Sequence, residues 1–299
     1  MPSARDTDEC HLGVDGGDDV EVESPDYTGI VDIDKADIRS KLQHFRVLVI
    51  GRINAGKTTL LKKLTKSPEL FDSEGRKVPH NSQFCCSERG LDGIDNQLAS
   101  KSNPKFVFHD SRGFQWGSVD ELERVKVFIA ERASRKSLSE QLHVIWYCLP
   151  TDTYETCTED ELQVFNTDLV GIGKPPILRV KSHTNTLIVP IILIFTKFDG
   201  LVDRAYVELR DEMNRIEAMR RETERAQEML TTLFIEPFMS MRFPPSALVR
   251  LDDMRKETSN CNELIGTTIN TLSDDVLRAF FVSVQQNNID FCICCAVQE

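Results

Sequence analysis

The stretch RVLVIGRINAGKT, residues 46–58, decides the fold class of this 299-residue chain. Its first five residues, of which the last four are apolar, have the length of a buried β-strand, and residues 51–58 match the pattern GxxxxGK(S/T). The spacing of the leucines that follow predicts a helix from Lys57 that ends before Pro68. A strand, a glycine-containing loop and a helix in this order are the setting in which the pattern binds phosphate groups.

The chemistry expected of this loop follows from its residue types. Glycines let the backbone turn its N–H groups toward negative charge, and the N-terminus of the following helix adds to the attraction. We expect the ammonium group of Lys57 to reach the β- and γ-phosphates of a nucleotide, and the hydroxyl of Thr58 to coordinate Mg²⁺. The predicted nucleotide contacts in the loop are Asn54, Ala55, Gly56, Lys57, Thr58 and Thr59.

Two further motifs follow apolar strands. Asp110 opens the motif DSRG directly after the strand 105–109, where a carboxylate can hold Mg²⁺ and the N–H of Gly113 can sense the γ-phosphate. The motif TKFD, residues 196–199, follows the strand 191–195. Asp199 can accept two hydrogen bonds from guanine that adenine cannot offer, and the stem of Lys197 can lie across the base.

The three motifs in this order resemble the G1, G3 and G4 motifs of translation-factor-type GTPases, especially the Era, TrmE and septin-like branch. The phrases FVFHDSRGF, QLHVIWYCLPTD and FTKFDGL also resemble a group of fungal G-domain-containing proteins. The resemblance covers residues 45–290 and implies a Ras-like P-loop G domain, an α/β fold of three layers with a mostly parallel central sheet. It implies GTP or GDP and Mg²⁺ as ligands, with Thr58 and Asp110 at the metal and Thr196, Lys197 and Asp199 at the base. The candidates for a catalytic role are Lys57 and Gly113.

The chain departs from the family pattern at four places. Thr196 stands where an asparagine is usual, so the choice of guanine depends mainly on Asp199. Residues 67–109 contain no threonine to offer to Mg²⁺ from the first switch loop, which leaves Ser82, Ser87 and Ser100 as alternatives. Phe114 occupies the position of the glutamine that orients the attacking water in Ras-like proteins. The fifth motif is either a remnant at residues 246–247 or the loop at residues 252–254.

Short apolar runs alternate with helical patterns along the chain, which is typical of an α/β domain. The runs predict strands at residues 46–50, 106–108, 143–149, 191–195 and 247–251. Helices are predicted at residues 119–135, 158–169, 261–272 and 274–286, with one long charged helix over residues 203–233. Residues 67–104 read as a long switch I loop, and residues 173–189 as a surface hairpin or an insertion.

Charge and composition set the ends of the chain apart. Residues 1–37 hold twelve acidic and two basic residues, so this acidic segment is expected to be a disordered tail. The net charge of the whole chain is −12, and the acidity of residues 1–37 argues against nucleic acid as the main partner, because phosphate contacts need basic patches. Residues 291–299 form a cysteine-rich tail. Without a signal sequence or a long apolar run, we expect a cytoplasmic protein that does not associate with membranes.

These features predict a GTP-dependent molecular switch with slow intrinsic hydrolysis. The alternative is a module that holds GTP or GDP without turnover and serves as an interaction scaffold. Partners are then an effector or activating protein, or a second copy that binds through the switch regions.

Overall fold

The computed structural model describes most of the central part of the chain. The described residues are 43–72, 75–77, 94–95, 97–101, 103–110, 119–154, 156–159, 161–162, 178–181, 186–273 and 275–284. The acidic segment 1–37 and the cysteine-rich segment 291–299 lie outside them, as do Gly113 and Phe114.

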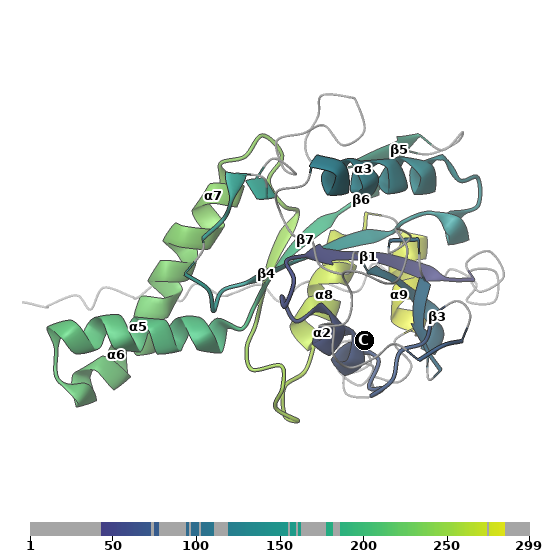
Figure 1. Ribbon diagram of the computed structural model, residues 1–299. Helices are drawn as coiled ribbons and strands as arrows, with labels where there is room; N and C mark the ends of the chain where they lie inside the picture. The colour runs from purple at the N-terminus through teal and green to yellow at the C-terminus, as the bar shows by residue number, and fades with distance from the viewer. Residues whose placement is uncertain are drawn as a thin grey trace, which may run out of the picture.

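A six-stranded sheet forms the centre of the fold (Figure 1). Its strand order is β2-β3-β1-β4-β7-β8, and all neighbours run parallel except β2 and β3, which are antiparallel. The strands are β1 (Phe45–Gly51), β2 (Gln97–Ser100), β3 (Asn103–Asp110), β4 (Val144–Pro150), β7 (Ile191–Thr196) and β8 (Ala247–Leu251). Every residue of β1, β4 and β7 is buried, as expected for parallel strands that are covered on both faces.

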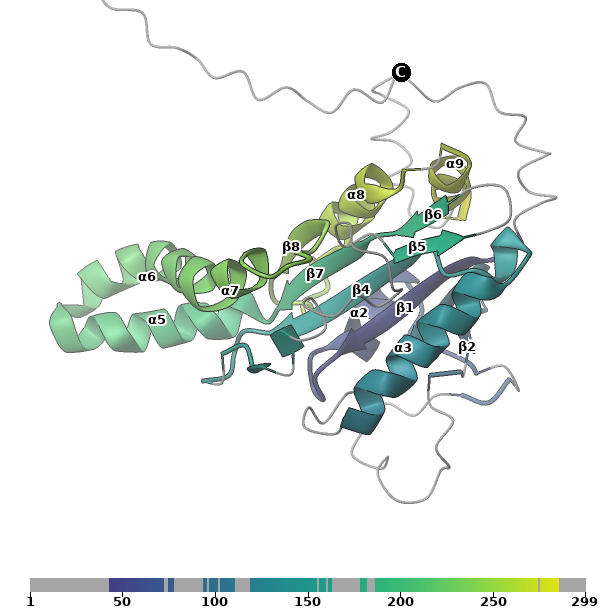
Figure 2. The ribbon, with the colours of Figure 1, turned by 90° about the horizontal axis from the view of Figure 1, so that it is seen from above.

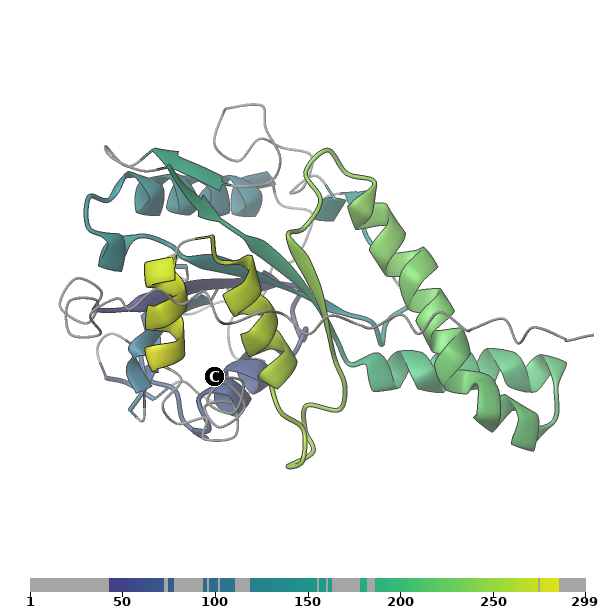
Figure 3. The same cartoon turned by 180° about the vertical axis from the view of Figure 1, so that it is seen from behind.

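Helices cover both faces of the sheet, which makes this an α/β architecture (Figure 1). On one face lies α3 (Val119–Ser134); on the other lie α2 (Lys57–Leu64), α8 (Asn262–Thr271) and α9 (Asp275–Val284). Figure 3 shows α8 and α9 side by side from the opposite direction. The ring of Phe281 in α9 packs 4.7 Å from Phe45 and 5.6 Å from Phe106, so α9 is held against the strands that flank the first motif.

A helical hairpin projects from the side of the domain (Figure 2). It consists of α5 (Phe198–Glu212) and α6 (Arg215–Leu230), and the chain returns through a π-helical turn, η3 (Thr231–Ile235), and α7 (Glu236–Met239). The single helix predicted over residues 203–233 is therefore wrong. The helical run is interrupted at Asn214. Its side chain accepts a hydrogen bond from the N–H of Glu217 and so caps the start of a new helix, α6.

The other predicted helices and strands can be compared with the structure one by one. The strands at residues 46–50, 106–108, 143–149, 191–195 and 247–251 are present, as are helices at the predicted places in α2, α3, α8 and α9. The strand β2 falls within the predicted loop 67–104, which is thus not loop throughout. Within residues 173–189, β5 (Leu178–Lys181) and β6 (Thr186–Val189) pair as an antiparallel hairpin. Most of the helix predicted at 158–169 lies outside the described residues. No helix in the described part of the chain has both the length and the apolar character needed to cross a membrane.

Candidate nucleotide-binding site

The three motifs converge at the edge of the sheet where the parallel strands end. The strand register places Val49 beside Asp110, Pro150 beside Thr196, and Thr196 beside Leu251. The loop after β1, the carboxylate at the end of β3 and the motif after β7 therefore share one edge. In open α/β sheets this carboxyl edge is where ligands bind.

The loop between β1 and α2 takes the backbone conformations that its glycines permit. Gly51 has φ +141°, and a Cβ atom there would lie 2.0 Å from the carbonyl oxygen of Cys148. Gly56 caps α2 in the left-handed region at φ +78°, and Asn54 is also left-handed at φ +63°. None of the described residues in the first turn of α2 is acidic. The N-cap residue Gly56 has no side chain to cap this turn, so its N–H groups are the place where an anionic ligand would bind.

Lys57 is folded back into this loop. Its side chain is buried, and its Nζ donates hydrogen bonds to the carbonyl oxygens of Gly51, at 2.9 Å, and Arg52, at 2.8 Å. Burial lowers the pKa of Lys57 below its ordinary value, and the negative charge of Asp110 opposes that shift. Burying the Lys57 ammonium group away from water costs free energy. Hydrogen bonds to loop carbonyls and the charge of Asp110 offset part of this cost, and an anion bound in the loop would offset more of it.

The predicted metal ligands are a hydroxyl and a carboxylate on neighbouring elements. Thr58 is half-buried in the first turn of α2, and Asp110 is half-buried at the end of β3. Asp110 is close enough to Lys57 for its negative charge to act on the pKa of that ammonium group, so the carboxylate lies near the loop after β1. Hard oxygen donors of this kind suit Mg²⁺, which keeps several of its waters and takes few ligands from the protein.

Arg52 fixes the loop to the neighbouring segment by a contact that the motif does not predict. Its guanidinium forms a two-pronged pair with the fully buried carboxylate of Glu161, at 2.5 Å and 2.6 Å, and donates to the carbonyl oxygen of Thr156 at 2.6 Å. Burial by itself lowers the pKa of Arg52, but the Glu161 contact outweighs it and the pKa is raised. A sequence signal for this carboxylate exists, because Thr158 and Glu161 have the spacing of a helix capping box and exchange hydrogen bonds.

The third motif is linked to the phosphate loop through Thr196. Its Oγ1 donates a 2.9 Å hydrogen bond to the carbonyl oxygen of Ala55, and its own carbonyl accepts from the N–H and the hydroxyl of Thr151. Lys197 is left-handed at φ +59°, and its Nζ lies 2.8 Å from the carboxylate of Asp152. Asp199 accepts a 3.0 Å hydrogen bond from the backbone N–H of Asp253. Sequence reasoning did not identify Thr151 or Asp152, whereas Asp253 belongs to the loop 252–254 that it offered as an alternative for the fifth motif.

The structure excludes one of the two alternatives for the fifth motif. Ser246 bonds to Ile191 at the amino end of β7, which is the opposite edge of the sheet from Thr196. A role of residues 246–247 at the base is therefore excluded. Asp252 and Asp253 follow β8 at the same edge as Asp199, and Asp253 touches its carboxylate.

One alternative for the switch I magnesium ligand is also wrong. Ser100 is buried in β2 and pairs with Asn103 at the start of β3, while Asp110 is at the end of β3. Seven residue steps along a strand span roughly 23 Å, so the Ser100 hydroxyl is at the wrong end of the sheet. Ser82 and Ser87 lie outside the described residues.

Comparisons with known proteins identify no family for this chain. No protein-family model matches it, and a search of curated proteins gave no significant match. The function therefore has to be inferred from the geometry of the site.

Proposed function

We propose that this protein binds GTP with Mg²⁺ and acts as a molecular switch that hydrolyses GTP slowly. The observation that carries the proposal is the position of Lys57, a buried cation bonded to the carbonyls of Gly51 and Arg52 at the N-terminus of a helix. The buried ammonium group and the helix N-terminus both favour an anion with several negative oxygens, and a nucleoside triphosphate is the ligand expected from a loop of this sequence.

Guanine is favoured over adenine by the motif after β7. The carboxylate of Asp199 is on the same sheet edge as the phosphate loop, and Thr196 links the two motifs directly. A carboxylate can accept from both the N1–H and the exocyclic amine of guanine, whereas adenine leaves it with no matching donors. In this proposal the Asp253 N–H holds Asp199 in the empty protein, and the base competes for the same oxygen.

Mg²⁺ would be held by Thr58 and Asp110 together with the phosphates. Bound there, the ion would neutralise negative charge that develops during phosphoryl transfer. Lys57 would act beside it as a point charge on the β- and γ-phosphates. The N–H of Gly113 would sense the γ-phosphate, and residues 67–104 and 113–118 would form the switches that respond to it.

Hydrolysis is proposed to be slow because Phe114 cannot hydrogen-bond to a water molecule. An effector or activating protein, or a second copy bound through the switch regions, would supply the missing group. The site offers no reason to expect nucleic acid, and we place the protein in the cytoplasm without membrane association. The alternative is a scaffold that holds GTP or GDP without turnover; the same residue, Phe114, and the lack of a switch threonine favour it.

The nucleotide that co-purifies with the protein tests the proposal. We expect the denatured, freshly purified chain to release GDP or GTP near equimolar with protein, and the Lys57→Ala variant to release none. A preparation that carries ATP or ADP instead would contradict the assignment of guanine. Phosphate release per bound GTP then separates the switch, which turns over slowly, from the scaffold, which does not.

A further inference from the structure

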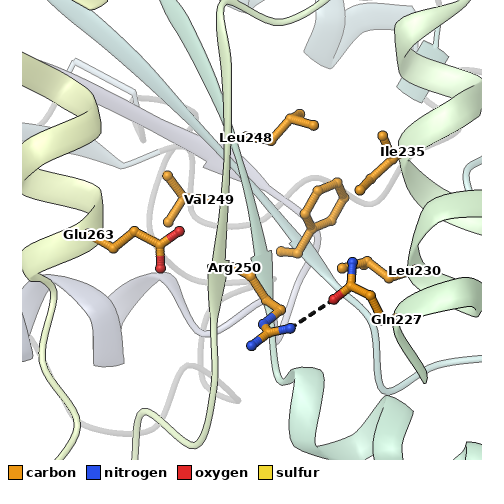
Figure 4. Close-up of a pocket in the computed structure, with 8 residues that line it drawn as sticks. Gln227, Leu230, Ile235, Leu248, Val249, Arg250 and Glu263 are labelled. Carbon is orange, nitrogen blue, oxygen red and sulfur yellow. Dashed lines mark hydrogen bonds between the residues drawn. The ribbon is translucent and has the colours of Figure 1, made fainter. Parts of the chain in front are cut away.

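The outer edge of β8 lies at the bottom of a groove on the side of the domain (Figure 4). The groove contains a cavity of about 260 Å³ and is open to solvent. Helix α6 and the turn η3 border it on one side, and the start of α8 borders it on the other. The residues that line it are Phe195, Gln227, Leu230, Ile235, Leu248, Val249, Arg250 and Glu263.

The backbone of this strand has hydrogen-bonding groups that point into the groove. On β7, the carbonyl groups of Pro190 and Thr196 accept from β4, so the alternate residues Ile191, Leu193 and Phe195 face β8. Val249, which is paired with Ile194, is therefore the residue of β8 whose backbone faces β7. The N–H and C=O groups of Leu248 and Arg250 consequently point outward. Among the described strands, none pairs with this edge.

The two walls of the groove differ in chemistry. Beyond Leu248, one wall of the groove is lined by apolar residues: Phe195 and Leu230 are buried and Ile235 is half-buried. Figure 4 shows Leu230 and Ile235 on this side. Glu263 stands on the opposite side of the strand, next to Val249. An added strand would direct successive side chains to opposite walls, because the side-chain period of a strand is two.

The charge of Glu263 indicates which type of side chain would bind on its side of the groove. Glu263 is exposed and makes no hydrogen bond or ion pair with any other residue in the described ranges. The positive charge of Arg250, in contrast, is already engaged by Gln227 at 2.8 Å, Asp252 at 3.2 Å and the ring of Phe198. A basic residue is therefore the matching partner.

We propose that this groove binds an extended segment of a partner protein, which adds as a strand to β8 with aliphatic residues toward Leu230 and Ile235 and lysine or arginine toward Glu263. The flanking helices distinguish this occupant from a second copy. The edge of another folded domain would bring its own helices against α6 and α8, which flank the groove, whereas a single extended segment would bring none. The proposal does not depend on nucleotide binding.

A labelled peptide tests the proposal on the full chain. The probe is the acetylated peptide Thr-Val-Lys-Val-Lys-Val-Thr, with fluorescence anisotropy as the readout, and we expect saturable binding. Two further peptides have the same side chains, but one carries backbone N-methyl groups on its valines and the other on its lysines. Each therefore lacks the backbone N–H donors of one alternate set of residues. One of the two should lose binding and the other should keep it within about twofold, because only alternate residues of an added strand face β8.

Charge reversal tests the role of Glu263. Glu263→Lys should weaken the lysine peptide by about two- to fivefold and strengthen a Thr-Val-Glu-Val-Glu-Val-Thr peptide by a similar factor. Glu212→Lys, at the far end of α5, is the matched control and should change neither affinity. This exchange of preference cannot result from misfolding, because the variant gains a ligand.

Four outcomes would overturn the proposal. The first is no saturable binding of the lysine peptide, and the second is equal binding of the two methylated peptides. The third is self-association of the chain that Glu263→Lys abolishes, because the edge would then be occupied by a second copy. The fourth is binding that is gained only after removal of residues 1–42 or 285–299, because a segment of the chain itself would then fill the groove.

Discussion

The hydroxyl of Thr196 donates a hydrogen bond of 2.9 Å to the carbonyl oxygen of Ala55, across 141 positions of sequence. Both groups are buried. The contact connects the loop after β1 with the motif after β7, so it helps to position the two halves of the proposed nucleotide site relative to each other.

Thr196→Val tests this contact, because valine keeps the shape of the side chain and removes the donor. We expect the free energy of unfolding in urea to fall by about 1–2 kcal/mol, since the Ala55 carbonyl would remain buried without this donor. Nucleotide affinity should fall as well. Thr196→Ser keeps the hydroxyl and should behave nearly like the wild type. Equal losses in the two variants would show that packing, not the hydrogen bond, is the contribution of Thr196.

Asp199→Asn tests the proposed role of Asp199 in recognising the guanine base. An amide can donate to the extra acceptor of xanthine but can no longer take both donors of guanine, so the preference for GTP over xanthosine triphosphate should fall by about 10- to 100-fold. Competition of the two unlabelled nucleotides against a fluorescent analogue measures this ratio. A variant that kept the full preference for GTP would remove Asp199 from the base site.

Phe114→Gln tests the assignment of slow hydrolysis. Glutamine can orient a water molecule and a phenyl ring cannot, so single-turnover phosphate release should be faster in the variant than in the wild type. Wild-type turnover should rise with protein concentration if a second copy completes the site. Fast wild-type hydrolysis that does not depend on concentration would contradict both statements.

The buried histidine His143 predicts a loss of stability in acid. Its Nδ1 accepts from the N–H of Arg46 at 2.8 Å, its Nε2 lies 2.9 Å from the Leu138 carbonyl, and burial lowers its pKa from 6.5 to about 4. Between pH 6.5 and pH 4, His143 is protonated in the unfolded chain and neutral in the folded chain. The free energy of unfolding therefore falls as the pH falls. The contribution of His143 to this loss is about 1.4 kcal/mol for each pH unit, or about 3 kcal/mol by pH 4.

Two measurements check this expectation. The free energy of unfolding should decline between pH 6.5 and pH 4, and the imidazole resonances of His143 should not titrate above pH 5 in the folded protein. An imidazole that titrates with an ordinary midpoint would show that this ring is charged in the fold and that its contacts do not depend on the neutral form.

Most of the sheet could be predicted because its central strands are continuous apolar runs that are buried on both faces. The strand β2 could not, because its four residues alternate between buried and half-buried and include polar Gln97 and Ser100. Such a short edge strand owes its structure to pairing with β3 and not to its own sequence. The break between α5 and α6 was predictable in principle, since Asn214 and Glu217 carry the spacing of a helix cap.

Some features of the candidate site could likewise be predicted from the sequence, and others could not. Motif spacing was enough to predict that Lys57, Asp110 and Asp199 follow strands of one parallel sheet, and thus share an edge. The contacts of Arg52 with Glu161 and of Asp199 with Asp253 join segments that are far apart in sequence. No local pattern specifies which of the many acids and amides will meet, because that depends on the packing of the whole domain.

A titration with fluorescent GTP and ATP analogues in Mg²⁺ tests the central claim most directly. The account predicts saturable binding of the GTP analogue, weaker binding when Mg²⁺ is chelated, and little binding of the ATP analogue. Lys57→Ala should abolish binding and keep a folded circular dichroism spectrum, while Lys62→Ala on the same helix should bind like the wild type. Absence of saturable GTP binding by the wild type, or unchanged affinity in Lys57→Ala, would contradict the account.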